Sequence, residues 1–174
     1  MKTIYKKYCN DIQNPALGAF LIYTFSSVFY ENKNTYANLL DIFIFIPLIM
    51  VRDVRELIFW FDENNKSHKI TKMSKLYEKI GYIGKTKDNF AIGTINNTIF
   101  KFREYIMSSI IFAIEAKLVF INSNGQVVPN KTKLQNKELN DDLQNLANAT
   151  AILAKIYAND YDINEAIKYL EVIL

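Results

Sequence analysis

Residues 95–128 read INNTIFKFREYIMSSIIFAIEAKLVFINSNGQVV and carry the strongest structural signals of the chain. Apolar side chains recur in the first part at steps of four, three, four, four and three residues: Ile95, Ile99, Phe102, Ile106, Ile110 and Ala113. This is the period of an α-helix. A β-branched and aromatic run (118–121), an Asn-Gly turn (124–125) and a second short apolar run then predict a β-hairpin over about residues 117–128. A helix pair followed by a tight hairpin is the order of a winged helix-turn-helix, in which the hairpin is the wing.

The segment that begins at Asn14 predicts another helix. Asparagine accepts hydrogen bonds from the free N–H groups of a first helical turn, and Pro15 is preset for the helical backbone. Apolar residues then recur at helical spacing as far as Glu31. The first turns of this helix carry small side chains at Ala16, Gly18 and Ala19. Such positions are typical of close packing against a neighbouring helix and also suit a binding surface.

The next segment has two possible interpretations. The run of residues 42–46, Ile-Phe-Ile-Phe-Ile, favours a strand by β-propensity. Asn38 with Asp41 at the capping-box position, and an apolar pattern that continues to Ile58, favour a helix. We expect a helix that is broken or restarts at Pro47.

The remaining segments also predict helices. Ser67 begins one that is expected to end at Gly81. In the tail, one helix runs to Tyr157, and Asp162 with Glu165 forms the capping box of a second. Because the connection between these two helices is short, we expect them to pack antiparallel.

The composition indicates one compact domain. The chain has 174 residues, half of them apolar, with only five glycines and three prolines. We therefore expect a single domain over residues 1–174, mainly α, with N-terminal helices (1–61), a winged-helix-like part (66–130) and a C-terminal helix pair (134–174). The most apolar stretch, residues 39–61, contains five charged residues, which excludes a membrane span. With one cysteine and no signal-peptide pattern, the sequence predicts a cytoplasmic protein with no disulfide of its own and no membrane partner.

The residues that carry catalysis are few. His68 is the only histidine and Cys9 the only cysteine, so no zinc site of the Cys/His type can form within the chain. Gly84-Lys85-Thr86 copies the end of a phosphate-binding loop, but position 79 is lysine where that loop needs glycine. We expect no enzyme activity, no metal and no cofactor.

One charge cluster stands out. Between residues 66 and 87 there are seven lysines and one acid, Glu78, whereas the whole chain has a net charge of +3. Four of these lysines fall in one sector of the predicted helix: Lys69, Lys72, Lys75 and Lys79. Such a basic face beside a winged-helix-like core is typical of contact with a DNA backbone. The alternative is a solvated face opposite a core stripe, and the lack of arginine argues against base-specific recognition.

Several segments together resemble the middle components of bacterial ABC-three-component systems. Residues 14–21, Asn-Pro-Ala-Leu-Gly-Ala-Phe-Leu, resemble the N-terminal "NPALGA" signature of that family. The apolar run that ends at Met50, followed by Arg52 and Arg55, is similar to its second motif. The helix and hairpin of residues 96–128 and the helical patterns after residue 146 are similar to its remaining parts.

The resemblance implies a function as well as a fold. Such a middle component is a small non-enzymatic partner of an SMC-like ATPase, and in Lamassu-type anti-phage defence it sits on the ATPase heads beside a nuclease effector. The resemblance therefore implies an adaptor that couples DNA sensing by the ATPase to the nuclease, with double-stranded DNA contacted through the complex. We take as candidate partner-binding residues those of the first motif and two aromatic residues of the same helix: Asn14, Pro15, Gly18, Tyr23 and Tyr30.

A second hypothesis from a different class stays open. A free-standing winged-helix transcriptional regulator would bind duplex DNA as a homodimer, with an affinity that falls steeply as salt rises. The adaptor would bind DNA weakly or not at all in isolation and would form a stable complex with a large ATPase.

Overall fold

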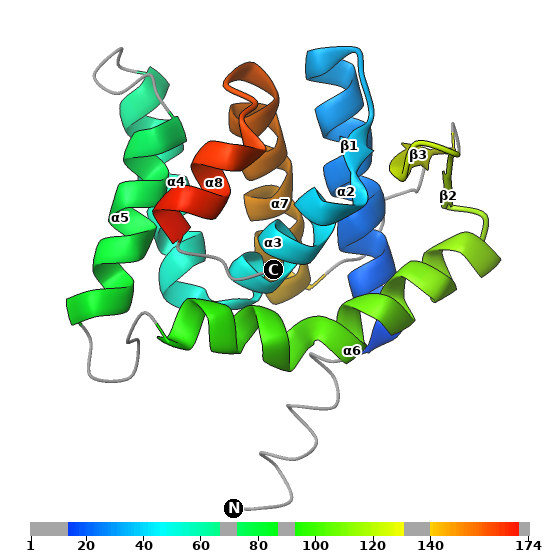
Figure 1. The fold of residues 1–174 in the computed structure, drawn as a ribbon, viewed down its shortest axis with the longest axis horizontal. Coiled ribbons are helices and arrows are strands. Elements are labelled where there is room, and N and C mark those ends of the chain that lie inside the picture. Colours follow the sequence, from blue (N-terminus) through cyan, green and yellow to red (C-terminus); the bar gives the residue numbers. More distant parts are fainter. Residues whose placement is uncertain (1–13, 67–72, 87–92, 131–139, 171–174) are drawn as a thin grey trace, which may run out of the picture.

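The structure is a computed structural model that describes residues 14–66, 73–86, 93–130 and 140–170. Within these residues the chain is mainly helical, with a small antiparallel sheet, as the sequence predicted (Figure 1). The elements in chain order are α2 (Pro15–Lys33), β1 (Ala37–Asn38), α3 (Leu39–Met50), α4 (Arg52–Lys66), α5 (Met73–Thr86), α6 (Gly93–Glu115), β2 (Val119–Ile121), β3 (Gln126–Pro129), α7 (Asp141–Asn159) and α8 (Ile163–Leu170).

Helix α2 begins as its sequence predicts and runs two residues beyond Glu31, to Lys33. Asn14 Oδ1 accepts a hydrogen bond from the Ala16 N–H at 2.9 Å, and Pro15 occupies the first helical position. At the other end, Asn34 takes the left-handed conformation with φ 57° and its N–H donates to the Tyr30 carbonyl. The helix is therefore fixed at both ends by local hydrogen bonds.

Helix α3 confirms the helical interpretation of the Ile-Phe-Ile-Phe-Ile run, but the predicted break at Pro47 is wrong. The Asp41 carboxylate accepts the Asn38 N–H at 2.7 Å, which completes one half of the capping box. The helix then continues through Pro47 as far as Met50, and the chain turns at Val51 instead. Because α3 is buried along most of its length, its tertiary packing outweighs the hydrogen bond that proline cannot donate.

The predicted hairpin is confirmed, and a third strand extends it. In the sheet, β3 lies between β1 and β2 and is antiparallel to both, with Phe120 opposite Val128 and Ala37 opposite Val127. Gly125 has φ 72°, a backbone conformation that the tight turn requires and that glycine adopts without strain. Strand β1 was not predicted, because two residues are too short to show the alternation of a strand.

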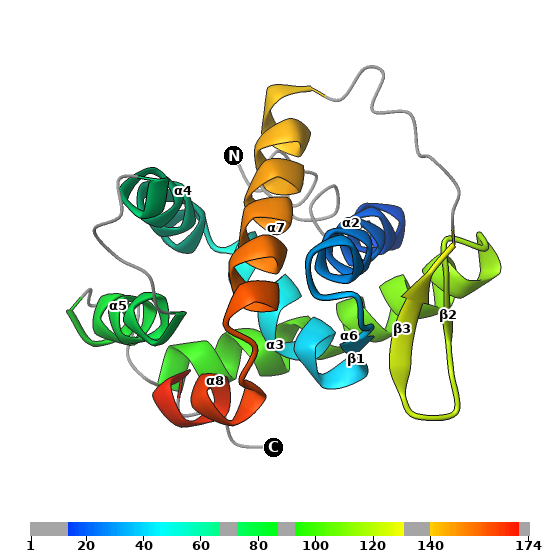
Figure 2. The ribbon, with the colours of Figure 1, turned by 90° about the horizontal axis from the view of Figure 1, so that it is seen from above.

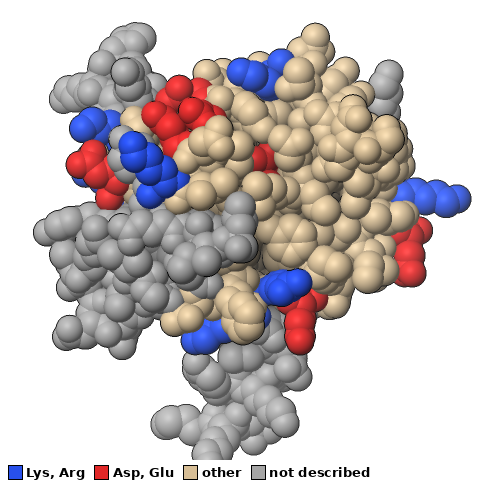
Figure 3. Space-filling model, in the orientation of Figure 1, with Lys and Arg blue, Asp and Glu red and all other residues tan. Residues whose placement is uncertain are grey.

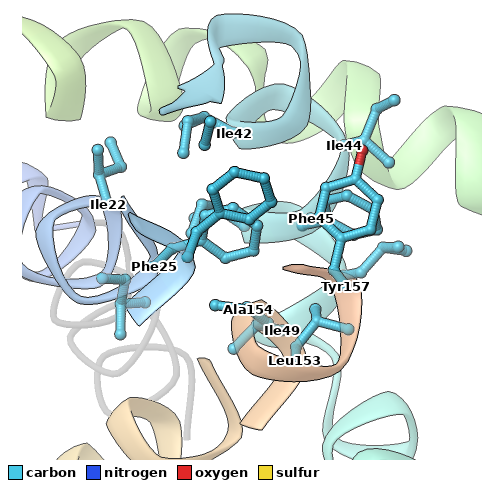
Figure 4. Packing of buried hydrophobic residues seen from close by; sticks show 14 of the residues in the cluster. Ile22, Phe25, Ile42, Ile44, Phe45, Ile49, Leu153, Ala154 and Tyr157 are labelled. Carbon is cyan, nitrogen blue, oxygen red and sulfur yellow. The ribbon is translucent and has the colours of Figure 1, made fainter. Parts of the chain in front are cut away.

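The core lies between α2, α3 and α7. In Figure 4 the rings of Phe25, Phe45 and Tyr157 lie together, with aliphatic side chains of the three helices around them. The centroids of Phe45 and Tyr157 are 4.5 Å apart, and those of Phe25 and Phe45 are 5.8 Å apart. Helix α2 packs mainly against α7 and α6, and α6 runs across one end of the upright helices in Figure 1. Segments from opposite ends of the chain thus share one apolar interior.

The C-terminal helices are both present, but their predicted antiparallel packing is wrong. Helix α8 packs against α5, and Figure 2 shows it crossing one end of α7 instead of returning along it. Asp160, at the end of α7, accepts the Met73 N–H at 2.7 Å and so joins this point to the start of α5. Tyr161 packs its ring on Phe29 at 5.5 Å. These two contacts fix the turn between α7 and α8.

The end of α5 also differs from the prediction. The helix continues through Gly81 and Gly84 to Thr86, since a glycine inside a helix costs only about 1 kcal/mol relative to alanine. Gly84-Lys85-Thr86 is therefore the last helical turn and not part of a loop. The predicted start at Ser67 lies outside the described residues.

The resemblance to a winged helix-turn-helix stays a prediction. Within the described residues, α5 packs on α4 and α8, whereas α6 packs on α2 and α3. The hairpin follows α6 in the sequence, as the wing of such a domain does. Its second strand, β3, also pairs with β1, from the N-terminal part of the chain.

Candidate functional site

Two motifs that lie far apart in the sequence meet at one groove, which we call the motif groove. Its cavity volume is about 910 Å³, and its walls are the first turns of α2, the junction of α3 with α4, and the first turns of α7. The residues that define it here are Asn14, Leu17, Phe20, Met50, Arg52 and Asn140. The NPALGA segment and the segment around Arg52 are therefore neighbours in space, which the sequence alone did not show.

The polar groups of the motif groove hold the ends of its helices. Asn140 Oδ1 accepts the Leu143 N–H at 2.9 Å, as Asn14 does for α2. Arg55 Nη1 donates to the carbonyls of Ile49 and Met50, at 2.8 and 3.0 Å, and so caps the C-terminal end of α3. Arg52 forms an exposed salt bridge with Glu56 at 2.9 Å. Most of this polarity thus serves the local structure, and the groove offers a mixed apolar and polar surface.

The most perturbed carboxyl of the described residues lies inside the core. Asp41 is fully buried, and the Tyr157 hydroxyl donates to it at 2.8 Å. Burial raises the pKa of Asp41 from 3.8 to about 6, although its hydrogen bonds from Tyr157 and from the Asn38 N–H oppose the shift. Burial also raises the pKa of the Tyr157 hydroxyl far above its ordinary value, with the Asp41 charge adding to the effect. Asn38 Nδ2 donates to Tyr161 Oη at 2.5 Å, so the group joins α3, β1 and the end of α7. This arrangement serves the packing of the chain.

The predicted interface residues do not form one surface. Asn14 is exposed and Pro15 half-buried at the start of α2, and Asn14 lines the motif groove. Gly18 is buried against α6: a Cβ atom at this position would lie 2.6 Å from Ser109 Cβ and 2.9 Å from Tyr105 Cζ. The structure therefore shows close helix packing at Gly18, which is the alternative that the sequence left open.

The two aromatic candidates on α2 each interact with other residues of the chain. Tyr23 is half-buried and has a partner in the structure. Tyr30 is 37% exposed and stacks on Tyr36, with ring centroids 4.9 Å apart and an interplanar angle of 10°. Tyr30 thus presents an aromatic surface near the C-terminal end of α2, whereas the motif groove lies at the first turns of this helix.

The lysine cluster is only partly described. Lys69 and Lys72 lie outside the described residues, as do His68 and Cys9. On α5, Lys75 Nζ is 3.3 Å from Glu78 Oε2, and Lys79 Nζ lies 4.5 Å from the centroid of the Trp60 ring. Both described lysines are exposed, and each contacts a side chain of its own protein. A DNA-backbone role for this face stays a prediction.

An exposed row of apolar side chains on α6 was not predicted from the sequence. Helix α6 has apolar side chains on two opposite faces, and the inner face packs on α2 and α3. On the outer face, the side chains that we call the α6 stripe are exposed to 73%, 47%, 53% and 41%: Phe100, Met107, Ile111 and Ile114. Their helical spacing was a signal in the sequence, but the stronger inner stripe masked it.

Apolar side chains are also exposed beyond the end of α6. Figure 3 shows that much of the described surface in this view carries neither Lys and Arg nor Asp and Glu. Strand β2, which begins four residues after the end of α6, adds two exposed apolar side chains, Phe120 and Ile121. A row of exposed apolar side chains such as the α6 stripe is typical of binding sites in soluble proteins.

Two kinds of site are not found in the described part of the chain. No group of three or more His, Cys, Asp or Glu residues there could hold a metal ion. None of the described helices is both long enough and apolar enough to span a bilayer.

The comparisons with known proteins give one result. A family model described as ABC-three component (ABC-3C) system Middle Component 3 matches residues 4–173. No match was found among curated proteins or among solved structures.

Proposed function

The chain belongs to the middle component 3 family of ABC-three-component systems, and from this membership we propose that it is a non-catalytic adaptor subunit. Its partners would be an SMC-like ATPase and a nuclease effector of a Lamassu-type anti-phage system. In that role the subunit docks on the ATPase heads and couples DNA sensing by the ATPase to the effector. Membership of a multi-component system supports the existence of protein partners, and the specific partners come from the resemblance of the sequence motifs.

The observation that carries the adaptor function is the α6 stripe. Four large apolar side chains on one helix face are exposed to between 41% and 73%. Fully burying one such side chain is worth about 1.5–3 kcal/mol, so water at this face is costly and a protein partner relieves the cost. A surface of this type suits a subunit that works within an assembly.

The titratable groups support a non-catalytic role. The strongly perturbed groups of the described residues are Asp41 and tyrosines of the interior, and Asp41 is fully buried. A catalytic acid or base must reach its substrate within hydrogen-bond distance. The pKa shift of Asp41 is explained by packing without any chemistry on a substrate.

Co-purification from a native operon tests the proposal. An affinity-tagged copy is expressed with the products of the adjacent genes, and the eluate is analysed by mass spectrometry and by size-exclusion chromatography with light scattering. We expect a stable complex that contains a nucleotide-hydrolysing SMC-like subunit and a nuclease. Recovery of the tagged chain alone would contradict the adaptor function.

A DNA-binding assay distinguishes the adaptor from the rival regulator. Fluorescence anisotropy with labelled duplex DNA is measured on the isolated chain between low and physiological salt. We expect weak binding or none, whereas a regulator would bind tightly with a steep salt dependence. The same assay on a Lys75→Gln/Lys79→Gln variant tests the described lysines. If the variant and the wild type bind DNA equally, these lysines do not contribute to the residual affinity.

A further inference from the structure

We propose that the α6 stripe is one half of a two-helix coiled coil, and that the other half is an amphipathic helix of the partner subunit that carries Arg or Lys opposite Glu104. The inference rests on the proposed adaptor function and names the surface and the chemistry of its partner.

The spacing of the stripe is that of a coiled-coil seam. With Glu104 included, its members follow one another at steps of four, three, four and three residues: Phe100, Glu104, Met107, Ile111 and Ile114. Alternating steps of three and four define the a and d positions of a heptad. At 100° per residue these five positions fall in a sector of about 80°, opposite the face that carries Ser109 and Ala113. They span about 21 Å of helix, or two heptads.

The depth of exposure argues for a helical occupant. Phe100 and Ile111, the most exposed members, project well beyond the backbone of a long, regular helix. Projecting side chains in a single row fit the holes between four side chains of a second helix. Ser109 and Ala113 are buried on the other side of α6, so a partner here does not compete with the core.

Glu104 identifies the charge that the partner must bring. It is exposed now, and a coiled coil on the stripe would place it in an otherwise apolar seam. Removing an acid from water without a partner is costly, whereas a facing Arg or Lys offsets that cost and fixes the register. Exposed Arg103 flanks the seam on one side and favours an acidic residue at the edge of the partner helix.

The same residue argues against a second copy of this chain as the occupant. If two α6 helices paired in parallel and in register, Glu104 would face Glu104, and the like charges would repel. If they paired antiparallel with the stripes superimposed, Phe100 would face Ile114 and Glu104 would face Ile111, which leaves the carboxylate unpaired. A basic, heterologous helix satisfies Glu104 in a way that the chain itself does not.

Matched variants of α6 test the surface. The affinity of the purified chain for the partner subunit, isolated from the complex described above, is measured by biolayer interferometry. We expect Ile111→Ser and Met107→Ser each to weaken binding about tenfold or more, as hot-spot truncations do. Phe112→Ser is the control, because Phe112 lies on the same helix, 42% exposed, but off the stripe, and we expect less than a threefold change. Circular dichroism melts confirm that each variant is folded.

Charge reversal tests the basic partner. We expect Glu104→Lys to weaken binding at least tenfold and Glu104→Gln to weaken it less, because glutamine removes the attraction without adding repulsion. A photocrosslinking residue at position 111 then identifies the partner peptide. A captured helix with apolar residues at alternating three- and four-residue steps and a basic residue among them supports the inference, whereas capture of a loop or strand overturns it.

The outcomes separate this inference from the adaptor function. If the wild type binds its partner and the stripe variants bind equally well, the coiled coil is wrong and the adaptor function stands. If the wild type is a dimer that Ile111→Ser converts to a monomer, the occupant is a second copy and the inference is wrong. If the wild type binds no partner at all, both proposals fail.

Discussion

At the residue scale, Gly18 shows how one atom sets the distance between two helices. Its hydrogen faces Ser109 of α6, whose hydroxyl donates to the Tyr105 carbonyl one turn earlier in its own helix, at 2.7 Å. The serine is thereby held in place and cannot swing away to admit a methyl group. The backbones of α2 and α6 approach closely here because position 18 has no side chain.

We expect Gly18→Ala to lower the free energy of unfolding by about 1–3 kcal/mol, since the added Cβ overpacks the crossing. Urea denaturation followed by circular dichroism measures the change. Ser109→Gly in the same chain removes the facing Cβ and Oγ, so the double variant should lose less than the sum of the two single changes. Strict additivity would show that the crossing is looser than the structure indicates.

Asp41 predicts how stability depends on pH. Its pKa is about 6 in the folded chain and 3.8 in an unfolded one, so the folded state holds its proton more tightly. Its contribution to stability is fully present below pH 3.8 and is lost as the pH rises through about 6. By 1.36 kcal/mol per pKa unit, the loss is about 3 kcal/mol.

Asp41→Asn should remove this dependence, because asparagine does not titrate. Urea midpoints between pH 4 and pH 7 measure the slope, and Asp142→Asn, at an exposed position in the first turn of α7, serves as the control. An unchanged slope in Asp41→Asn would mean that another group accounts for the dependence.

At the scale of the element, the features that depend on local sequence could be predicted, whereas those that depend on tertiary packing could not. The caps at Asn14 and Asp162, the Asn-Gly turn and the inner stripe of α6 each depend on neighbours within a few residues, and the structure confirms them. Pro47 and Gly81 were misjudged because burial and tertiary contacts outweigh their local preferences. The motif groove depends on contacts between segments far apart in the sequence, which one sequence does not reveal.

Two arginines at the start of α4 allow a matched prediction. Arg55→Ala should cost about 1–3 kcal/mol of unfolding free energy, since two carbonyls at the end of α3 lose a charged donor. Arg52→Ala should change it by less than about 0.5 kcal/mol, because its salt bridge with Glu56 is exposed. Thermal melts of the two variants side by side provide the measurement, and equal losses would contradict the capping role of Arg55.

At the scale of the whole molecule, the described helices contribute to one apolar interior. Buried side chains from α2 through α8 belong to a single cluster, which includes Phe25, Phe45, Tyr77 and Tyr157. The predicted single domain therefore has a direct consequence for unfolding, because elements that share a core lose it together.

We expect one cooperative transition in urea. Trp60 is the only tryptophan of the chain and packs under Lys79 of α5, so its fluorescence reports on the contact of α4 with α5. Far-UV circular dichroism reports on all helices. The two midpoints should coincide, and an earlier fluorescence transition would show that α4 and α5 unfold as a separate unit.

The hydrogen bond between Tyr157 and Asp41 joins residues that are 116 positions apart. During synthesis on the ribosome, the carboxylate at position 41 has no hydroxyl to accept from until Tyr157 has been made. Helix α2 likewise emerges long before α7, one of the two helices against which it mainly packs. The nascent chain therefore cannot close this interior in stages from α2 onward, and the core is completed only after α7 has been synthesised.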